Sequence, residues 1–261
     1  MINLEQYLAK INITKKIPTL TYLNEIISAH QKSISFNNLA VYFRPGEILD
    51  LELAALFSKV ILEGKGGYCF ENNKVFYYLL KKLGFEVEAK AARVIYDNPG
   101  DVPRTHRTTV VTIDGKKYLA DVGFGKDVPR QAVPIGVKRE NGGHQVIVDG
   151  SLYRHQLLKE EKIINLYTFD DGHYLESDFK VGNYYTNTHP DSKFVKELIV
   201  VRTAGELVEF INGKTYSRIV NNVRENKEIS NQEEFAVYLE RFGIFETYDF
   251  SKLSENFPSG I

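Results

Sequence analysis

Two adjacent residues, Asp114 and Gly115, constrain the fold of this chain more than any other feature of its sequence. Aspartate followed by glycine is strongly preferred in the two-residue turn of a β-hairpin. Alternating apolar and polar residues flank the pair on both sides and predict strands at 106–113 and 116–122. A turn of two residues fixes the register of these strands, because Ile113 must then pair with Lys116.

This register places two polar side chains on one face of the predicted hairpin. It sets Thr108 opposite Asp121 and Gly123 opposite His106. His106 and Asp121 are then diagonal neighbours whose Cα atoms lie roughly 7–8 Å apart, which is within reach of their side chains. A β-bulge would shift the register by one residue and place them on opposite faces. The sequence therefore predicts a His–Asp contact that depends on a regular hairpin.

The spacing of apolar residues changes near residue 84 and indicates an α+β fold. Before that point apolar residues recur every three to four positions, as in amphipathic helices, and after it they alternate, as in strands. Helices are expected at 4–11 after an Asn3 cap, after Thr21, at 50–62, at 68–83 with Gly84 as its glycine cap, and at Asn231–Phe242. Further strands are expected at 85–95, 145–148, 152–158, 165–169 and 198–202.

The composition is that of an ordinary globular chain and excludes several classes of function. Of 261 residues, 43% are hydrophobic and 26% are charged, and the net charge is −1 with an isoelectric point near 6.6. This balance gives no overall field to attract nucleic acid or an anionic membrane. The N-terminus has no signal-peptide pattern, and no stretch approaches the roughly 18 apolar residues of a membrane span. We therefore expect a cytoplasmic protein with neither nucleic-acid nor membrane partners.

The chain contains a single cysteine, Cys69. One cysteine cannot form an intrachain disulfide or a cysteine-based zinc site, and we expect no metal. Cys69 follows Gly66 and Gly67 and falls in the first turn of the predicted helix 68–83. There, free amide N–H groups and the helix dipole favour the thiolate over the thiol. A buried structural cysteine is the alternative, and position alone does not separate the two.

Cys69, His106 and Asp121 together indicate nucleophilic catalysis. A carboxylate that accepts a hydrogen bond from one imidazole nitrogen leaves the other nitrogen to take the thiol proton. The other five histidines have no carboxylate placed in this way by the local sequence. We therefore interpret the three residues as a Cys–His–Asp triad, with backbone N–H groups near Cys69 as oxyanion donors.

Four stretches of the sequence resemble motifs of one known family. Residues 66–73 read GGYCFENN and resemble the nucleophile motif of the arylamine N-acetyltransferases, and residues 121–125, DVGFG, resemble their aspartate motif. His106 stands at the expected distance before the second motif. Residues 187–194, NTHPDSKF, and 30–39, HQKSISFNNL, resemble two further stretches of that family.

The resemblance implies a fold of three parts: a helical bundle at 1–84 bearing the nucleophile, an antiparallel β-barrel at 85–190 bearing histidine and aspartate, and an α/β lid at 191–261. It also implies ping-pong transfer, in which Cys69 takes acetyl from acetyl-CoA and passes it to an arylamine, arylhydrazine or N-hydroxyarylamine. The expected walls of the acceptor pocket are Phe36, Phe124 and Phe194, with Val94 or Ile95 behind them. For Phe36, an ordinary core position stays equally open.

A separate signal concerns the phosphates of CoA. The stretch 123–128 contains glycine and could present N–H groups to a pyrophosphate, with basic side chains close by. We expect Gly125, Lys126 and Arg130 to contribute to this binding.

Two positions depart from the family pattern. Lys65 stands where the family usually has arginine before the two glycines, and Asn37 stands where it usually has glutamate. In the family these two residues are thought to pair, so that bidentate ion pair is absent here. A hydrogen bond between Lys65 and Asn37 is the expected substitute.

Two alternatives stay open on the sequence. The same triad serves papain-like or transglutaminase-like hydrolases and amide synthases. A non-catalytic binding module with a structural cysteine also fits the composition. Acetylation of Cys69 by acetyl-CoA separates a transferase from a hydrolase, and the rate of Cys69 alkylation at pH 6 separates a reactive thiol from a structural one.

Overall fold

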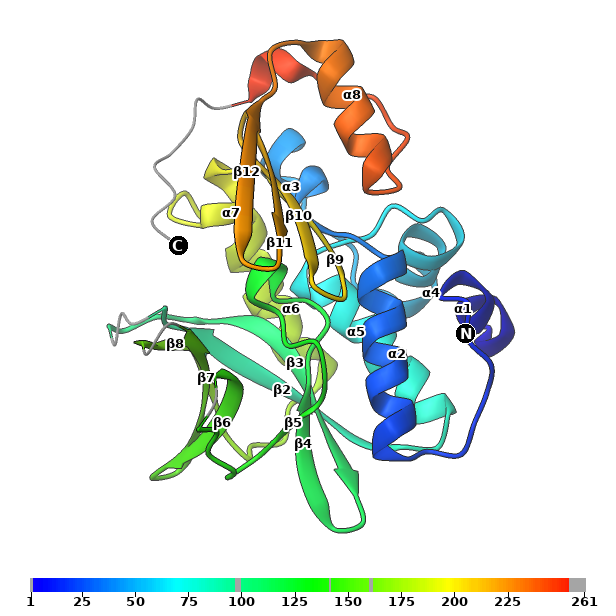
Figure 1. The fold of residues 1–261 in the computed structure, drawn as a ribbon, viewed down its shortest axis with the longest axis vertical. Helices are drawn as coiled ribbons and strands as arrows, with labels where there is room; N and C mark the ends of the chain where they lie inside the picture. Colours follow the sequence, from blue (N-terminus) through cyan, green and yellow to red (C-terminus); the bar gives the residue numbers. More distant parts are fainter. Residues whose placement is uncertain (1, 97–99, 141, 160–161, 254–261) are drawn as a thin grey trace.

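A computed structural model describes residues 2–96, 100–140, 142–159 and 162–253 of the chain. The first third is helical (Figure 1), with α1 Leu4–Lys10, α2 Leu20–Ser33, α3 Leu39–Phe43, α4 Leu53–Leu56 running into a π-helical segment Phe57–Leu62, and α5 Cys69–Lys82. Asn3 caps α1, as predicted. The predicted start of α2 is wrong by two residues, because Thr19 rather than Thr21 accepts the free Tyr22 N–H at 3.2 Å. Gly84 follows α5 with φ +91°, which confirms the glycine cap.

The middle of the chain forms a seven-stranded antiparallel sheet in the order β5-β4-β3-β2-β8-β7-β6. Its strands are β2 Glu86–Val94, β3 Arg104–Ile113, β4 Lys116–Ala120, β5 Val133–Pro134, β6 Gly143–Asp149, β7 Leu152–Lys159 and β8 Lys162–Phe169. Bridges from Ile135 and Val137 to Val146 join the two outer strands, so the sheet is nearly closed into a barrel. The predicted hairpin register is confirmed, since Ile113 pairs with Lys116 and Thr109 with Ala120.

A second, five-stranded antiparallel sheet has the order β1-β9-β10-β11-β12. Its strands are β1 Phe36–Asn37, β9 Ile199–Ala204, β10 Leu207–Asn212, β11 Thr215–Val220 and β12 Val223–Glu228. The helix α8 Gln232–Arg241 packs on one face through a cluster that includes Val200, Ile211, Phe235 and Leu239. Because β1 comes from the helical third and pairs with β9, this sheet joins the helical third to the C-terminal part of the chain.

The sequence did not predict α6 Glu176–Thr188 or the short α7 Lys193–Lys196. The sequence of α6 contains glycine, asparagine and threonine, which are weak helix formers, so contacts with the rest of the fold decide its conformation. The chain is α+β, as predicted, with a helical bundle, a barrel-like sheet and a C-terminal α/β part. The division at residues 84 and 190 stays a prediction, and positions 254–261 of the third part lie outside the described residues. Within those residues, no helix is long and apolar enough to cross a membrane.

Candidate active site

Cys69 is the first residue of α5 and is 3% exposed. The loop before it needs glycine, because Gly66 has φ +63° and a Cβ there would collide with the Ser35 carbonyl oxygen. At the helix start, Glu71 accepts the Tyr68 N–H at 3.1 Å, and the Tyr68 phenol donates across to amide side chains of α6. The loop before α5 and the hydrogen bonds of Tyr68 therefore fix the position of the Cys69 backbone.

His106 lies on β3 and Asp121 directly follows β4. His106 Nε2 lies 2.6 Å from Asp121 Oδ2, and both side chains are closed to solvent. The ladder ends at Ala120, one residue before Asp121, yet the diagonal contact expected from the hairpin forms. With Nε2 engaged by the carboxylate, Nδ1 is the imidazole nitrogen left to receive another proton.

The Asp121 carboxylate accepts three more hydrogen bonds. Oδ1 accepts the Asn73 side-chain amide at 2.9 Å and the Gly123 N–H at 2.8 Å, and Oδ2 accepts the Tyr167 hydroxyl at 2.7 Å. Burial by itself would raise the pKa of Asp121, but the positive charge of protonated His106 and these donors outweigh it and hold that pKa below its usual range. The group is therefore a carboxylate that can only accept.

The motif that carries Asp121 packs directly against the helix that carries Cys69. A Cβ on Gly123 would lie 2.7 Å from Asn73 Nδ2 and 3.1 Å from Cys69 Cα, so only glycine fits there. Asn73 links the two motifs further, since its Oδ1 accepts the Val122 N–H at 3.0 Å. The structure thus brings the two motifs together although about fifty residues separate them in sequence.

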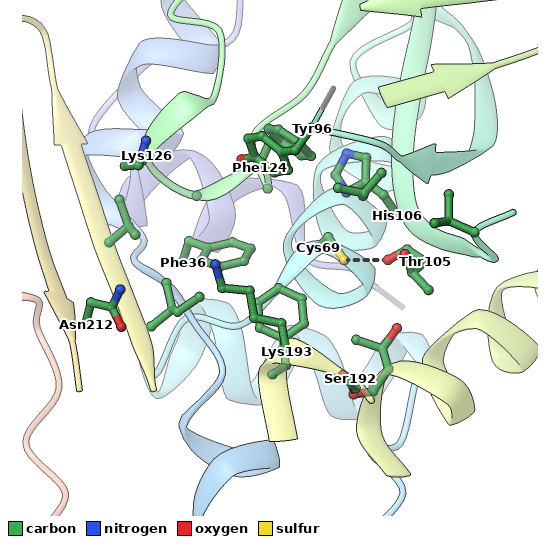
Figure 2. A pocket seen from close by; sticks show the side chains of 18 of the residues that line it. Phe36, Cys69, Tyr96, Thr105, His106, Phe124, Lys126, Ser192, Lys193 and Asn212 are labelled. Carbon is green, nitrogen blue, oxygen red and sulfur yellow. Dashed lines mark hydrogen bonds between the residues drawn. The ribbon is translucent and has the colours of Figure 1, made fainter. Parts of the chain in front are cut away.

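The electrostatic surroundings of Cys69 differ from the sequence-based expectation. Burial raises the pKa of the Cys69 thiol, and this effect exceeds the lowering by backbone N–H groups of Arg107 and Phe70. The backbone N–H groups act in the expected direction, but burial opposes them and has the larger effect. The Cys69 Sγ also lies 3.6 Å from the Thr105 carbonyl oxygen (Figure 2), an acceptor that suits a thiol proton. A thiolate therefore needs a nearby base to take the proton.

A cavity of about 310 Å³ opens onto Cys69 and His106. Figure 2 shows the aromatic side chains that surround the thiol, among them Phe36 and Phe124. Six of the residues predicted to bind substrates line this cavity: Phe36, Val94, Phe124, Gly125, Lys126 and Phe194.

Two predicted residues lie elsewhere. Ile95 and Arg130 are absent from the lining, and Arg130 donates instead to the Val128 carbonyl oxygen at 3.2 Å. Its surroundings are mostly protein, and burial lowers the pKa of Arg130 to about 10. Of the two basic residues expected to bind the phosphates of CoA, Lys126 therefore lines the cavity and Arg130 does not.

Several lining residues were missed. Tyr96 stacks on Phe124 with ring centroids 5.6 Å apart, and Lys193 and Arg224 bring positive charge. Lys193 lies within the stretch 187–194, whose resemblance to the family could have indicated a place in the cavity. Nothing in the sequence near Arg224 indicates that it lines the cavity, because its position depends on strand pairing at long range.

Asn37 and Lys65, the two residues that depart from the family pattern, are joined by a hydrogen bond to the main chain. Asn37 Nδ2 donates to the Lys65 carbonyl oxygen at 2.9 Å. The Lys65 ammonium points elsewhere and pairs with Glu63 at 2.7 Å and Glu246 at 2.6 Å. The expected Lys–Asn hydrogen bond therefore exists, but it uses the backbone of Lys65 rather than its charge.

Comparisons with known proteins agree on one family. A family model described as N-acetyltransferase matches residues 19–247. The arylamine N-acetyltransferase / N-hydroxyarylamine O-acetyltransferase of Salmonella typhimurium is 34% identical over 191 residues, covering 71% of this chain and 67% of that protein. The arylamine N-acetyltransferase of Mycolicibacterium smegmatis is 33% identical over 210 residues, covering 76% of each chain.

Solved structures give the same answer. The arylamine N-acetyltransferase of Salmonella typhimurium superimposes with a TM-score of 0.88 at 25% identity and covers 95% of both chains. The Mycobacterium marinum arylamine N-acetyltransferase in complex with CoA superimposes with a TM-score of 0.86 at 28% identity and covers 96% of both chains.

In the part of the chain that the structure describes, no group of three or more His, Cys, Asp or Glu side chains is placed to hold a metal ion.

Proposed function

Since this chain belongs to the arylamine N-acetyltransferase family and is an acyltransferase, we propose that it moves acetyl from acetyl-CoA to arylamines, arylhydrazines or N-hydroxyarylamines through an acetyl-Cys69 intermediate. One observation carries the proposal. Cys69 and His106 line the same cavity, and Asp121 holds His106 from behind it at 2.6 Å. The CoA complex of the Mycobacterium marinum relative supports the choice of donor.

In the first half of the reaction, Cys69 is acetylated. His106 Nδ1 takes the thiol proton while the sulfur attacks the thioester carbonyl carbon. Burial raises the pKa of the thiol, so the thiolate depends on His106 taking its proton and forms as one half of a thiolate–imidazolium pair oriented by Asp121. Backbone N–H groups at the start of α5 stabilise the developing oxyanion. The carbon–sulfur bond to CoA then breaks, and His106 returns the proton to the departing CoA sulfur.

In the second half, the acceptor amine attacks the carbonyl carbon of acetyl-Cys69. His106 accepts the amine proton, the carbon–sulfur bond of the intermediate breaks, and the same proton restores the thiol. Asp121 stays ionised throughout and keeps His106 in the tautomer that presents Nδ1.

The shape of the cavity supports a flat, apolar acceptor. Phe36, Phe124 and Phe194 line it together with Val94. The rings of Phe36 and Phe194 lie 6.0 Å apart at 52°, which leaves aromatic faces and edges for a planar substrate. The cavity of about 310 Å³ matches the lower end of small-molecule sites.

Two-substrate kinetics test the proposal. Initial rates with acetyl-CoA and an arylamine at several fixed concentrations are expected to give parallel double-reciprocal lines, and Cys69→Ser is expected to lose the activity. Intersecting lines, or near-normal transfer by Cys69→Ser, would overturn the proposed route. Release of acetate or cleavage of amides at a comparable rate would favour the hydrolase alternative instead.

A further inference from the structure

One face of the second sheet forms a wall of the active-site cavity. Val201 of β9 and Phe210 of β10 both line the cavity, and the strand register pairs them directly. Ile199 and Asn212 form the next pair along the same face and line the cavity too. Because side chains alternate along a strand, the opposite face is the one that packs against α8.

Arg224 lies on the same face, on the edge strand β12. Its guanidinium lies over the Phe210 ring, 5.1 Å from the centroid. Its Nε donates to Asn226 Oδ1 at 2.8 Å and its Nη2 donates to Ser217 Oγ at 3.1 Å. These partners are neutral, and among the residues with described side chains no carboxylate forms an ion pair with Arg224. Arg224 therefore lines the cavity with its positive charge uncompensated.

The sheet sets how far this charge lies from the thiol. Phe36 is on β1, beside the thiol, and Phe210, under the guanidinium, is on β10, two strand spacings of about 4.8 Å away, about 10 Å in all. The Arg224 side chain reaches back over Phe210, so the open path from Cys69 ends in a positive charge at the exposed edge of the sheet. An acyl donor with a long arm and a phosphorylated end brings an anionic group to this charge, whereas a small neutral arylamine does not.

The other cations of the cavity are more nearly neutralised. Lys126 Nζ lies 2.9 Å from a carboxylate oxygen of Asp127. Lys193 extends into the cavity toward Phe36 (Figure 2), and Glu197 lies 3.5 Å from its ammonium. Arg224 is thus the cation best placed to take a new anionic partner.

We propose, on the premise of the proposed function, that Arg224 binds a phosphate group of the CoA donor and so determines the preference for CoA thioesters over phosphate-free acetyl donors. The planar guanidinium offers parallel N–H donors to phosphate oxygens, a pairing stronger than a neutral hydrogen bond. Its seat on Phe210 and its bonds to Ser217 and Asn226 fix its orientation before the donor arrives.

The test compares two acetyl donors with the full-length protein. Arg224→Gln is expected to raise the KM for acetyl-CoA about tenfold, the loss of one charge-assisted contact. Its kcat/KM for p-nitrophenyl acetate, which has no phosphate, is expected to stay within about twofold of wild type, and Arg224→Lys is expected to fall between the two. Arg218→Gln is the matched control, because Arg218 lies on the neighbouring strand and pairs with Glu225 at 3.8 Å. This control is expected to leave both donors unaffected.

Three outcomes would overturn the inference. An unchanged KM for acetyl-CoA in Arg224→Gln, or equal losses with both donors, would show that Arg224 does not recognise phosphate. A KM that rises only for an anionic acceptor such as 4-aminobenzoate would assign Arg224 to the acceptor. Failure of the proposed function looks different, because the wild-type protein would then fail to take acetyl from either donor.

Discussion

His106 Nε2 lies 2.6 Å from Asp121 Oδ2, and the same carboxylate accepts hydrogen bonds from Tyr167, Asn73 and Gly123. Four donors converge on two oxygens in a site closed to solvent. Such a carboxylate is fixed in position and charge, so it determines which nitrogen of His106 faces the cavity. Three of these four donors come from α5, β8 and the loop after β4 rather than from β3.

Replacing Asp121 with asparagine tests this role. An amide in place of the carboxylate turns N–H groups toward donors that need an acceptor and disturbs the His106 tautomer. We expect Asp121→Asn to lower kcat by about 10⁴-fold, as in other triads, and to destabilise the fold by about 1–3 kcal/mol through unpaired buried groups. Acetyl-transfer kinetics and urea unfolding measure the two effects. A loss of activity below about tenfold would contradict the role of the Asp121 charge.

The reactivity of Cys69 depends on His106 as its base. Burial raises the pKa of the thiol, so without a base the thiolate appears only at alkaline pH. We expect wild-type Cys69 to react with iodoacetamide readily at pH 6–7 and His106→Gln to react at least about tenfold more slowly there, with its rate rising only above about pH 9. The chain has one cysteine, so the alkylation signal has one source. Equal rates at pH 7 in both proteins would show that His106 is not the base.

The contact between Asn37 and Lys65 predicts that replacing Asn37 destabilises the fold more than replacing Lys65. Asn37 is 3% exposed, and Asn37→Ala leaves the Lys65 carbonyl oxygen without its side-chain donor, at a cost of about 1–3 kcal/mol. Lys65→Met removes only partly exposed ion pairs and is expected to cost about 1 kcal/mol or less. Urea unfolding of both variants at neutral pH measures the difference. If Lys65→Met proved the more costly, the charge of Lys65 rather than its backbone would hold this loop.

An ion pair between a buried arginine and a partly exposed glutamate predicts a pH-dependent stability. Arg107 is fully buried, and Glu176 at the start of α6 accepts two of its N–H groups at 2.9 and 3.0 Å. Burial alone would raise the pKa of Glu176, but Arg107 and Lys74 lower it to about 2. A pKa below that of the unfolded chain means that the pair stabilises the fold above about pH 4.5 and that this contribution is lost as the pH falls toward 2.

Because the Glu176 side chain is 37% exposed and water screens the pair, Glu176→Gln is expected to lower the free energy of unfolding by about 1–2 kcal/mol at pH 7, and by progressively less below pH 4.5. Urea unfolding between pH 7 and pH 3 measures this change. Glu52→Gln is the control, since the pair of Glu52 with Lys180 is exposed and contributes little. A gap between wild type and Glu176→Gln that is the same at pH 3 and pH 7 would contradict the assignment.

Features determined by neighbouring residues could be predicted from the sequence. The Asp114-Gly115 turn specifies its own register, and that register led to the His106–Asp121 contact. Gly84 marks the end of α5 for the same reason, because its left-handed backbone is a local requirement.

Features that depend on long-range contacts could not be predicted. The Tyr167 hydroxyl reaches Asp121 from 46 residues away, and Arg224 reaches the cavity only because β1 pairs with β9 and three more strands follow. The burial of Cys69 could not be predicted for the same reason. A helix start is visible in the sequence, but the degree of burial that outweighs it is a property of the whole fold.

The central claim is that Cys69 carries the acetyl group, and intact-protein mass spectrometry tests it most directly. Incubation with acetyl-CoA in the absence of an acceptor is expected to add the mass of one acetyl group to the wild-type protein and none to Cys69→Ser. Addition of an arylamine is expected to remove that mass and yield the acetylated amine. A wild-type protein that gains no acetyl group, or a Cys69→Ser protein that gains one at the same rate, would contradict the account.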